Sequence, residues 1–199
     1  MIKYPNGKAF EVEAKTERKK KKSSEELSLS AANRGMNLEN DINLSLDYYR
    51  EKDIALIYKR PTPINIVKVD YSRGARIIDA YFEEQSTTDY NGVYKGKYID
   101  FEAKSTKSKT SIPLANISKH QIEHLKKVKL QGGIIFFIIA FENLDEVYLI
   151  DGEHIINFFE TAKRKSIPYG DIKENGYLIE MGYTPRLHII EAIDEAYFK

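Results

Sequence analysis

The sequence contains no cysteine. The chain can therefore form neither a disulfide framework nor a thiolate zinc site, and it has no cysteine nucleophile. An absence of cysteine fits a reducing compartment, and we expect the protein to be cytoplasmic. Long apolar segments are also missing: the longest strongly apolar run, residues 133–141, is about half the length of a membrane helix. The first residues lack the apolar stretch of a signal peptide, and we expect no association with a membrane.

An excess of one charge is missing as well, since 31 Lys and Arg stand against 30 Asp and Glu. The total gives little support to nucleic-acid binding, because domains with that function are usually strongly basic. The distribution is uneven, however. Bases outnumber acids in residues 1–32, 59–78 and 95–129, whereas acids dominate from residue 141 onward. The folded molecule could present a cationic face, although charges scattered over the surface would fit the same totals.

The length of 199 residues suits one α/β domain with appendages. Residues 1–32 are polar, include the run Arg-Lys-Lys-Lys-Lys at 18–22, and show no sustained apolar period. We predict a flexible basic arm here, which either follows DNA phosphates or acts as a solubilising tail. Residues 33–199 are predicted to form the folded domain.

Apolar periodicity predicts the elements of this domain. Leu38, Ile42, Leu46 and Tyr49 recur at the spacing of one helical face, which indicates a helix within residues 33–53. The run at 134–141 is apolar enough for a central strand buried on both faces. The order of elements predicts an α/β fold with a mixed sheet flanked by helices. Further strands are predicted at 54–58, 64–71, 75–82, 86–90, 98–105 and 146–150, and further helices at 118–130, 154–165 and 187–198.

Two of these strands, 64–71 and 75–82, are joined by a turn at residues 72–74 and form a predicted hairpin. The hairpin carries Lys68, Arg73 and Arg76. Its bases suit contacts with phosphates that select a branched shape, although a basic hairpin on an ordinary surface would have the same composition.

The predicted strand at residues 98–104 contains the candidate catalytic residues. Polar and apolar residues alternate there, so Asp100, Glu102 and Lys104 share one face. If a hairpin through Asn91-Gly92 pairs this strand with the preceding one, Asp89 comes beside Glu102. Two carboxylates with backbone carbonyls form an oxygen-rich site for Mg²⁺, and the lysine can steady a water or a developing charge.

An acid-x-Lys tripeptide alone is weak evidence for a catalytic site. The alternative interpretation is an ordinary strand face that is exposed to solvent. Asp89 followed by Glu102-Ala-Lys104 nevertheless resembles the catalytic signature of the restriction-endonuclease superfamily. Several segments together resemble the RecU family of Holliday-junction resolvases, namely residues 4–8, 33–39, 87–90, 99–105 and 117–121.

This resemblance implies a restriction-endonuclease-like core with a protruding hairpin stalk at about residues 59–80. It implies that Thr87, Asp89, Glu102 and Gln121 ligate Mg²⁺ directly or through water, with Mn²⁺ as a substitute, and that Lys104 stabilises the transition state. Alternatives stay open from the residues themselves. Gln121 could cap the helix that follows Ser118, and Thr87 could be an ordinary β-branched strand residue.

The resemblance further implies that Glu39 approaches the metal and that Arg34, Arg73 and Arg76 contact DNA. Glu39 could equally be a surface residue of its helix, and Arg34 could serve only to balance charge. By the same resemblance, the expected substrate is a four-way DNA junction. The expected assembly is a homodimer that nicks opposing strands symmetrically, and a recombinase is the expected protein partner.

Two rival interpretations come from other classes. His120-Gln-Ile-Glu-His124 matches the H-x-x-E-H pattern of inverted zincins, which predicts a zinc peptidase. Such short matches are common, and this one does not involve Asp89, Glu102 or Lys104. A non-catalytic protein that binds DNA junctions would also explain the basic arm and the hairpin.

Overall fold

A mixed sheet of six strands forms the centre of the protein, with the strand order β1-β4-β5-β7-β8-β10. The computed structural model describes the backbone of residues 24–82 and 87–199 and the side chains from Leu38 onward. Neighbouring strands are antiparallel except β5 and β7, which are parallel. This confirms the predicted α/β fold with a mixed sheet. In chain order the elements are α1 (Ser24–Glu51), β1 (Leu56–Lys59), β2 (Ile64–Asp70), β3 (Arg76–Phe82), β4 (Tyr90–Tyr94), β5 (Lys97–Thr106), β6 (Ser111–Pro113), the 3₁₀ helix η1 (Leu114–Asn116), α2 (Lys119–Leu130), β7 (Ile134–Phe141), β8 (Glu146–Asp151), α3 (Gly152–Thr161), β9 (Ser166–Pro168), α4 (Tyr169–Asn175), β10 (Gly176–Leu178) and α5 (Ile189–Tyr197).

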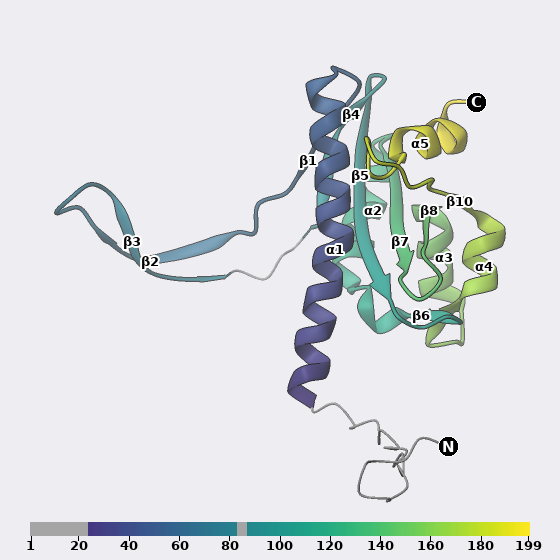
Figure 1. Ribbon diagram of the computed structural model, residues 1–199, viewed down its shortest axis with the longest axis horizontal. Coiled ribbons are helices and arrows are strands. Elements are labelled where there is room, and N and C mark those ends of the chain that lie inside the picture. The colour runs from purple at the N-terminus through teal and green to yellow at the C-terminus, as the bar shows by residue number, and fades with distance from the viewer. Residues whose placement is uncertain (1–23, 83–86) are drawn as a thin grey trace, which may run out of the picture. The chain divides into compact units, whose positions relative to one another are not determined.

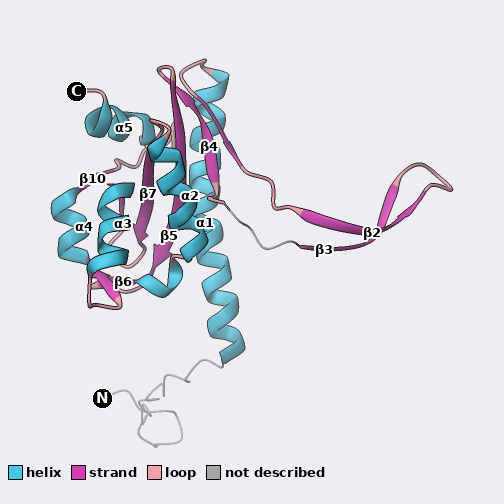
Figure 2. Cartoon of the chain, turned by 180° about the vertical axis from the view of Figure 1, so that it is seen from behind, coloured by secondary structure: helices cyan, strands magenta, loops and turns pink. Residues whose placement is uncertain are grey.

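Helices cover both faces of the sheet, so two apolar cores form. On strand β7, Phe136 and Ile138 enter the core that contains side chains of α1 and α5, while Ile135 and Phe137 enter the core under α2 and α3. Figure 2 shows α2 and α3 in front of the sheet and α1 behind it. The prediction of a central strand buried on both faces is therefore confirmed.

Helix α1 buries the predicted apolar stripe, Leu38, Ile42, Leu46 and Tyr49. It begins at Ser24, well before the predicted start at residue 33, so the helix extends into the segment predicted as a flexible arm, whose flexibility stays a prediction. This segment has no apolar period, but it opens with two acids, which the helix dipole favours, and it contains no proline or glycine. Residues 1–23 of the predicted arm lie outside the described residues.

Strands β2 and β3 pair only with each other and form the predicted hairpin. Ile64 lies opposite Phe82 at its base and Asp70 opposite Arg76 near its tip, where Gly74 has a positive φ of 94°. Every residue of β3 is exposed, so the strand does not pack into either core. Figure 1 shows β2 and β3 as a hairpin of two strands, and its role as a stalk stays a prediction.

The turn before β5 differs from the prediction. We predicted a strand at residues 86–90, with Asn91-Gly92 and Gly96 as turn residues before the next strand, but Asn91 and Gly92 lie inside β4. Gly96 makes the turn together with Lys95, with φ of 46° for Lys95 and 73° for Gly96, the positive values that a tight hairpin turn requires. Gly92 serves a different purpose: a Cβ atom there would lie 2.1 Å from the carbonyl oxygen of Leu56, so glycine lets β1 approach β4.

The remaining predicted elements are present with shifted ends. Helix α2 begins after Ser118 as predicted, whereas α3 ends at Thr161 rather than 165. Strands β6, β9 and β10 and helix α4 were not predicted. Within the described residues, no helix is both long enough and apolar enough to cross a membrane.

Candidate active site

Antiparallel pairing of β4 and β5 brings Asp89 beside Glu102. Tyr90 lies opposite Phe101, so the next position places these two acids opposite each other. The main-chain N–H of Asp89 donates to Oε2 of Glu102 at 3.1 Å, and the N–H of Ala103 donates to Oδ2 of Asp89 at 3.3 Å. The predicted neighbourhood of the two carboxylates is present, although another turn produces it.

Glu102 is the centre of the site. Its side chain is 1 % exposed. Its Oε1 accepts hydrogen bonds from Nζ of Lys104 at 2.5 Å and from Nε2 of Gln121 at 2.7 Å. The strand face that holds Glu102 and Lys104 is thus covered by helix α2 rather than solvated, which removes the plain alternative of an ordinary exposed strand face.

The electrostatics of Glu102 suit a nearby cation. Burial raises the pKa of Glu102 to about 7; the charge of Lys104 lowers it, and that of Asp89 raises it. A buried carboxylate next to a second carboxylate is stabilised as an anion when positive charge approaches. Its oxygen donors are those that Mg²⁺ prefers, so the residues fit such an ion. Residues 38–82 and 87–199 contain no cluster of three or more acid or histidine side chains arranged to hold a metal, so waters or carbonyls would complete its coordination.

Gln121 makes contacts both with the start of helix α2 and with the candidate site. Its Oε1 accepts the main-chain N–H of Ser118 at 3.1 Å, which caps helix α2. Its Nε2 donates to Glu102. The capping contact therefore holds the amide against the site, and its role as a metal ligand stays a prediction.

Glu39 lies on helix α1 and pairs with Lys59 at the end of β1. Tyr90, the neighbour of Asp89, donates its hydroxyl hydrogen to the carbonyl oxygen of Glu39 at 3.5 Å. Burial raises the pKa of Tyr90, and the charges of Glu39, Asp89 and Glu102 raise it further, so the three acids act on one phenol. Tyr90 belongs to the core under α1, on the face of the sheet opposite to Glu102, so the approach of Glu39 to the metal stays a prediction.

The other predicted residues are more scattered. Thr87 is partly buried and lies two residues before Asp89, while Arg73 and Arg76 are exposed at the tip of the hairpin, away from the carboxylates. The side chain of Arg34 lies outside the described residues. The roles predicted for these four residues stay predictions.

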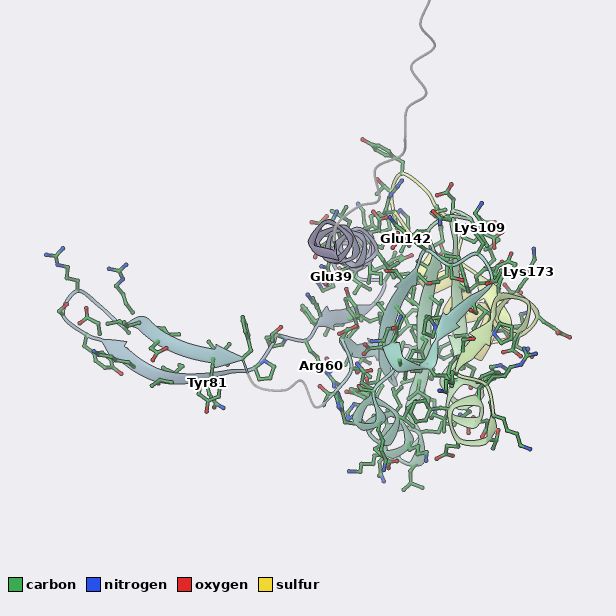
Figure 3. All side chains as sticks on the ribbon, turned by 90° about the horizontal axis from the view of Figure 1, so that it is seen from below. Glu39, Arg60, Tyr81, Lys109, Glu142 and Lys173 are labelled. Carbon is green, nitrogen blue, oxygen red and sulfur yellow. The ribbon has the colours of Figure 1, made fainter. Side chains whose placement is uncertain are left out.

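The histidines of the H-x-x-E-H segment bond to separate partners. Nε2 of His120 lies 3.0 Å from Oγ of Ser118, and Nε2 of His124 lies 2.9 Å from Oδ2 of Asp100. Arg60, which no sequence pattern identified, also binds Asp100 through its guanidinium. Figure 3 shows Arg60 where the chain leaves the core for the hairpin.

The mixed sheet, with Asp89, Glu102 and Lys104 in contact on it, matches the α/β nuclease core that the sequence led us to expect. The family model for RecU, Recombination protein U, matches residues 33–195, and the chain belongs to this family.

Two relatives carry the name Holliday junction resolvase RecU. The relative from a Geobacillus species is 49 % identical over 203 residues, which cover 100 % of this chain and 98 % of the relative. The relative from Bacillus cereus is 49 % identical over 202 residues, 99 % of this chain and 98 % of the relative. Among solved structures, Hjc from Archaeoglobus fulgidus, a Holliday junction resolvase, matches with 10 % identity and a TM-score of 0.41 over 69 % of this chain and 94 % of that chain.

Proposed function

We propose that this protein is an endodeoxyribonuclease that resolves Holliday junctions by paired symmetric nicks and depends on Mg²⁺, with Mn²⁺ as a substitute. Membership of the RecU family and the name shared by its relatives support the substrate. The observation that carries the chemistry is the contact of Asp89, Glu102 and Lys104 at one point of the sheet.

Asp89 and Glu102 would hold the metal ion, which supplies positive charge that stabilises the phosphate as negative charge develops on it. Lys104 already lies against Glu102, so its ammonium group is positioned for a phosphate oxygen or for the attacking water. Gln121 fixes the rotamer of Glu102, and the cover of α2 excludes bulk water. Together these residues perform phosphodiester hydrolysis.

The assembly belongs to the same proposal. Two opposing strands of a junction require two sites, and a homodimer supplies them symmetrically. The exposed hairpin with Arg73 and Arg76 would contact the junction, and a recombinase would be the partner during DNA recombination and repair.

The test compares a labelled four-way junction with a linear duplex of the same sequence, in Mg²⁺ and in EDTA. We expect symmetric nicks in the junction only, in Mg²⁺ only, and junction binding without product in EDTA. Binding without product in both Mg²⁺ and Mn²⁺ would favour a non-catalytic binding protein. Product in EDTA would exclude the metal dependence.

A further inference from the structure

A buried polar network lies next to the candidate active site and takes no part in the chemistry described above. At its centre is Asp100, which precedes Glu102 by two residues on β5 and is 0 % exposed. Its carboxylate accepts hydrogen bonds from four side chains: Nη2 of Arg60 at 2.5 Å, the hydroxyl of Tyr98 at 3.0 Å, Nε2 of His124 at 2.9 Å, and Oγ1 of Thr88.

The carboxylate of Asp100 is fully buried, and one of its four side-chain partners is the guanidinium of Arg60, whose positive charge compensates a buried carboxylate. A buried carboxylate that loses such partners is strongly unfavourable. The network is therefore held together by the charge at its centre.

Two of the four partners of Asp100, Arg60 and Thr88, come from the segments that flank the hairpin in sequence. Arg60 directly follows β1, where the chain enters the hairpin, and Thr88 follows the hairpin in sequence. One carboxylate thus binds both segments. The main-chain N–H of Arg60 also donates to the carbonyl oxygen of Asp89 at 2.8 Å, which ties the same root to a residue of the active site.

The hairpin depends on this root for its orientation, because β3 is exposed along its whole length and packs into neither core. Strand β2 has seven residues. At about 3.3 Å per residue such a strand is about 23 Å long. A tilt of about 10° at the root would move the tip by about 4 Å, more than the axial spacing of about 3.4 Å between successive phosphates of one DNA strand. A small tilt of the hairpin, permitted by loosened contacts at Asp100, would therefore change which DNA phosphate lies next to Glu102.

We propose that Arg60, Asp100 and Thr88 form a clasp that fixes the hairpin relative to Asp89 and Glu102 and so sets the distance from the branch point to the cleaved phosphate. The clasp residues are positioning residues, since they act through the hairpin root and through Asp89. The proposal rests on the proposed function for its substrate, and the geometry of the clasp can be measured without cleavage.

The first measurement maps nick positions on a labelled junction under single-turnover conditions. Asp100→Asn keeps the size of the side chain and removes its charge, and Arg60→Lys keeps a charge but loses the planar group that reaches several partners. We expect nicks spread over neighbouring phosphates and a rate lower by about 10²-fold, the scale for a displacement of about 1 Å. Junction affinity in EDTA should be unchanged, because the hairpin keeps its own charges.

The matched control is Asp171→Asn. Asp171 of α4 also accepts a hydrogen bond from a histidine, with Nε2 of His154 at 2.8 Å, but it has no contact with the hairpin root or the carboxylates. Wild-type nick positions are expected for this variant. If Asp100→Asn fails to fold, Thr88→Val and Tyr98→Phe remove hydroxyl contacts with Asp100 without removing a charge, and they carry the same test.

The second measurement needs no cleavage. Because the chain has no cysteine, Tyr71→Cys on the hairpin and Lys127→Cys on α2 can both be spin-labelled at exposed positions. The distribution of distances between the two labels should broaden when Asp100→Asn or Arg60→Lys is introduced into the labelled protein. Folded clasp variants with wild-type nick positions and a wild-type distribution would overturn the clasp. A wild-type protein that leaves junctions intact would instead overturn the proposed function, while the label distances would still decide the clasp.

Discussion

Nε2 of Gln121 lies 2.7 Å from Oε1 of Glu102, so the residue that caps helix α2 also orients the central acid of the candidate site. The opposite end of the same amide accepts the N–H of Ser118. The capping contact thereby joins the start of helix α2 to the sheet. A change of the Gln121 amide therefore affects both the helix cap and the orientation of Glu102.

Gln121→Glu separates the two roles. The new carboxylate can still accept the N–H of Ser118, but it cannot donate to Glu102 and places a further negative charge in a site where burial already raises the pKa of Glu102. We expect a lower unfolding temperature in EDTA and a larger increase on addition of Mg²⁺ than in the wild type. The control is Gln131→Glu, the same change at an exposed position after the same helix. Equal Mg²⁺ shifts in all three proteins would place the metal away from Gln121.

Replacement of Asp89 by Asn or Glu102 by Gln should abolish cleavage and leave junction binding intact, since the carboxylates hold the metal and other residues contact phosphates. Lys104→Ala should lower the rate by about 10²-fold or more, the scale for one preorganised charge. A second acid-x-Lys pair, Asp171 and Lys173 on α4, provides Asp171→Asn and Lys173→Ala as controls. Measured single-turnover rates that fall equally in both sets would refute the assignment of the site.

The strand pattern around Glu102 was predictable because alternation along one strand is a local property. Side chains of period two identified the shared face of Asp100, Glu102 and Lys104, and the antiparallel pairing placed Asp89 correctly. Gly96 was predicted correctly as a turn residue. Asn91-Gly92 was wrongly included in the turn, because these residues have turn chemistry but Gly92 is required by its contact with β1. No local pattern reports a contact with a third strand.

The network around Asp100 was hidden from the sequence for the same reason. Arg60 and His124 lie far from Asp100 along the chain and meet it only after α2 and β1 are placed on the sheet. Alternation predicted only that Asp100 shares one strand face with Glu102 and Lys104. The contacts of Asp100 show that two acids on one strand face can have different partners.

Gly92 offers a test of this packing. Gly92→Ala would place a methyl group 2.1 Å from the carbonyl oxygen of Leu56, and displacement of β1 should destabilise the protein by about 1–3 kcal/mol. In Gly170→Ala the new methyl group meets no atom within 4 Å, and the helical position should gain about 0.5–1 kcal/mol. Denaturant unfolding of both variants gives the comparison. Equal stability of the two variants would mean that β1 and β4 are not held so closely.

Reversal of charge at the hairpin tip tests shape selectivity. Arg73 and Arg76 lie beside the turn at Gly74, at the end of a hairpin whose second strand is wholly exposed, where they could enter the open centre of a junction. Replacing both by Glu should reduce junction affinity far more than duplex affinity. The ratio of the two affinities must be measured at one salt concentration, because loss of positive charge weakens every DNA complex, with a slope of about −0.9 in log K against log salt for each phosphate contact. Lys163→Glu with Arg164→Glu, exposed between α3 and β9, is the control for the same change in net charge and should lower both affinities alike. If the hairpin variant keeps the wild-type ratio, the junction is recognised elsewhere, and the hairpin bases contribute only general attraction to DNA.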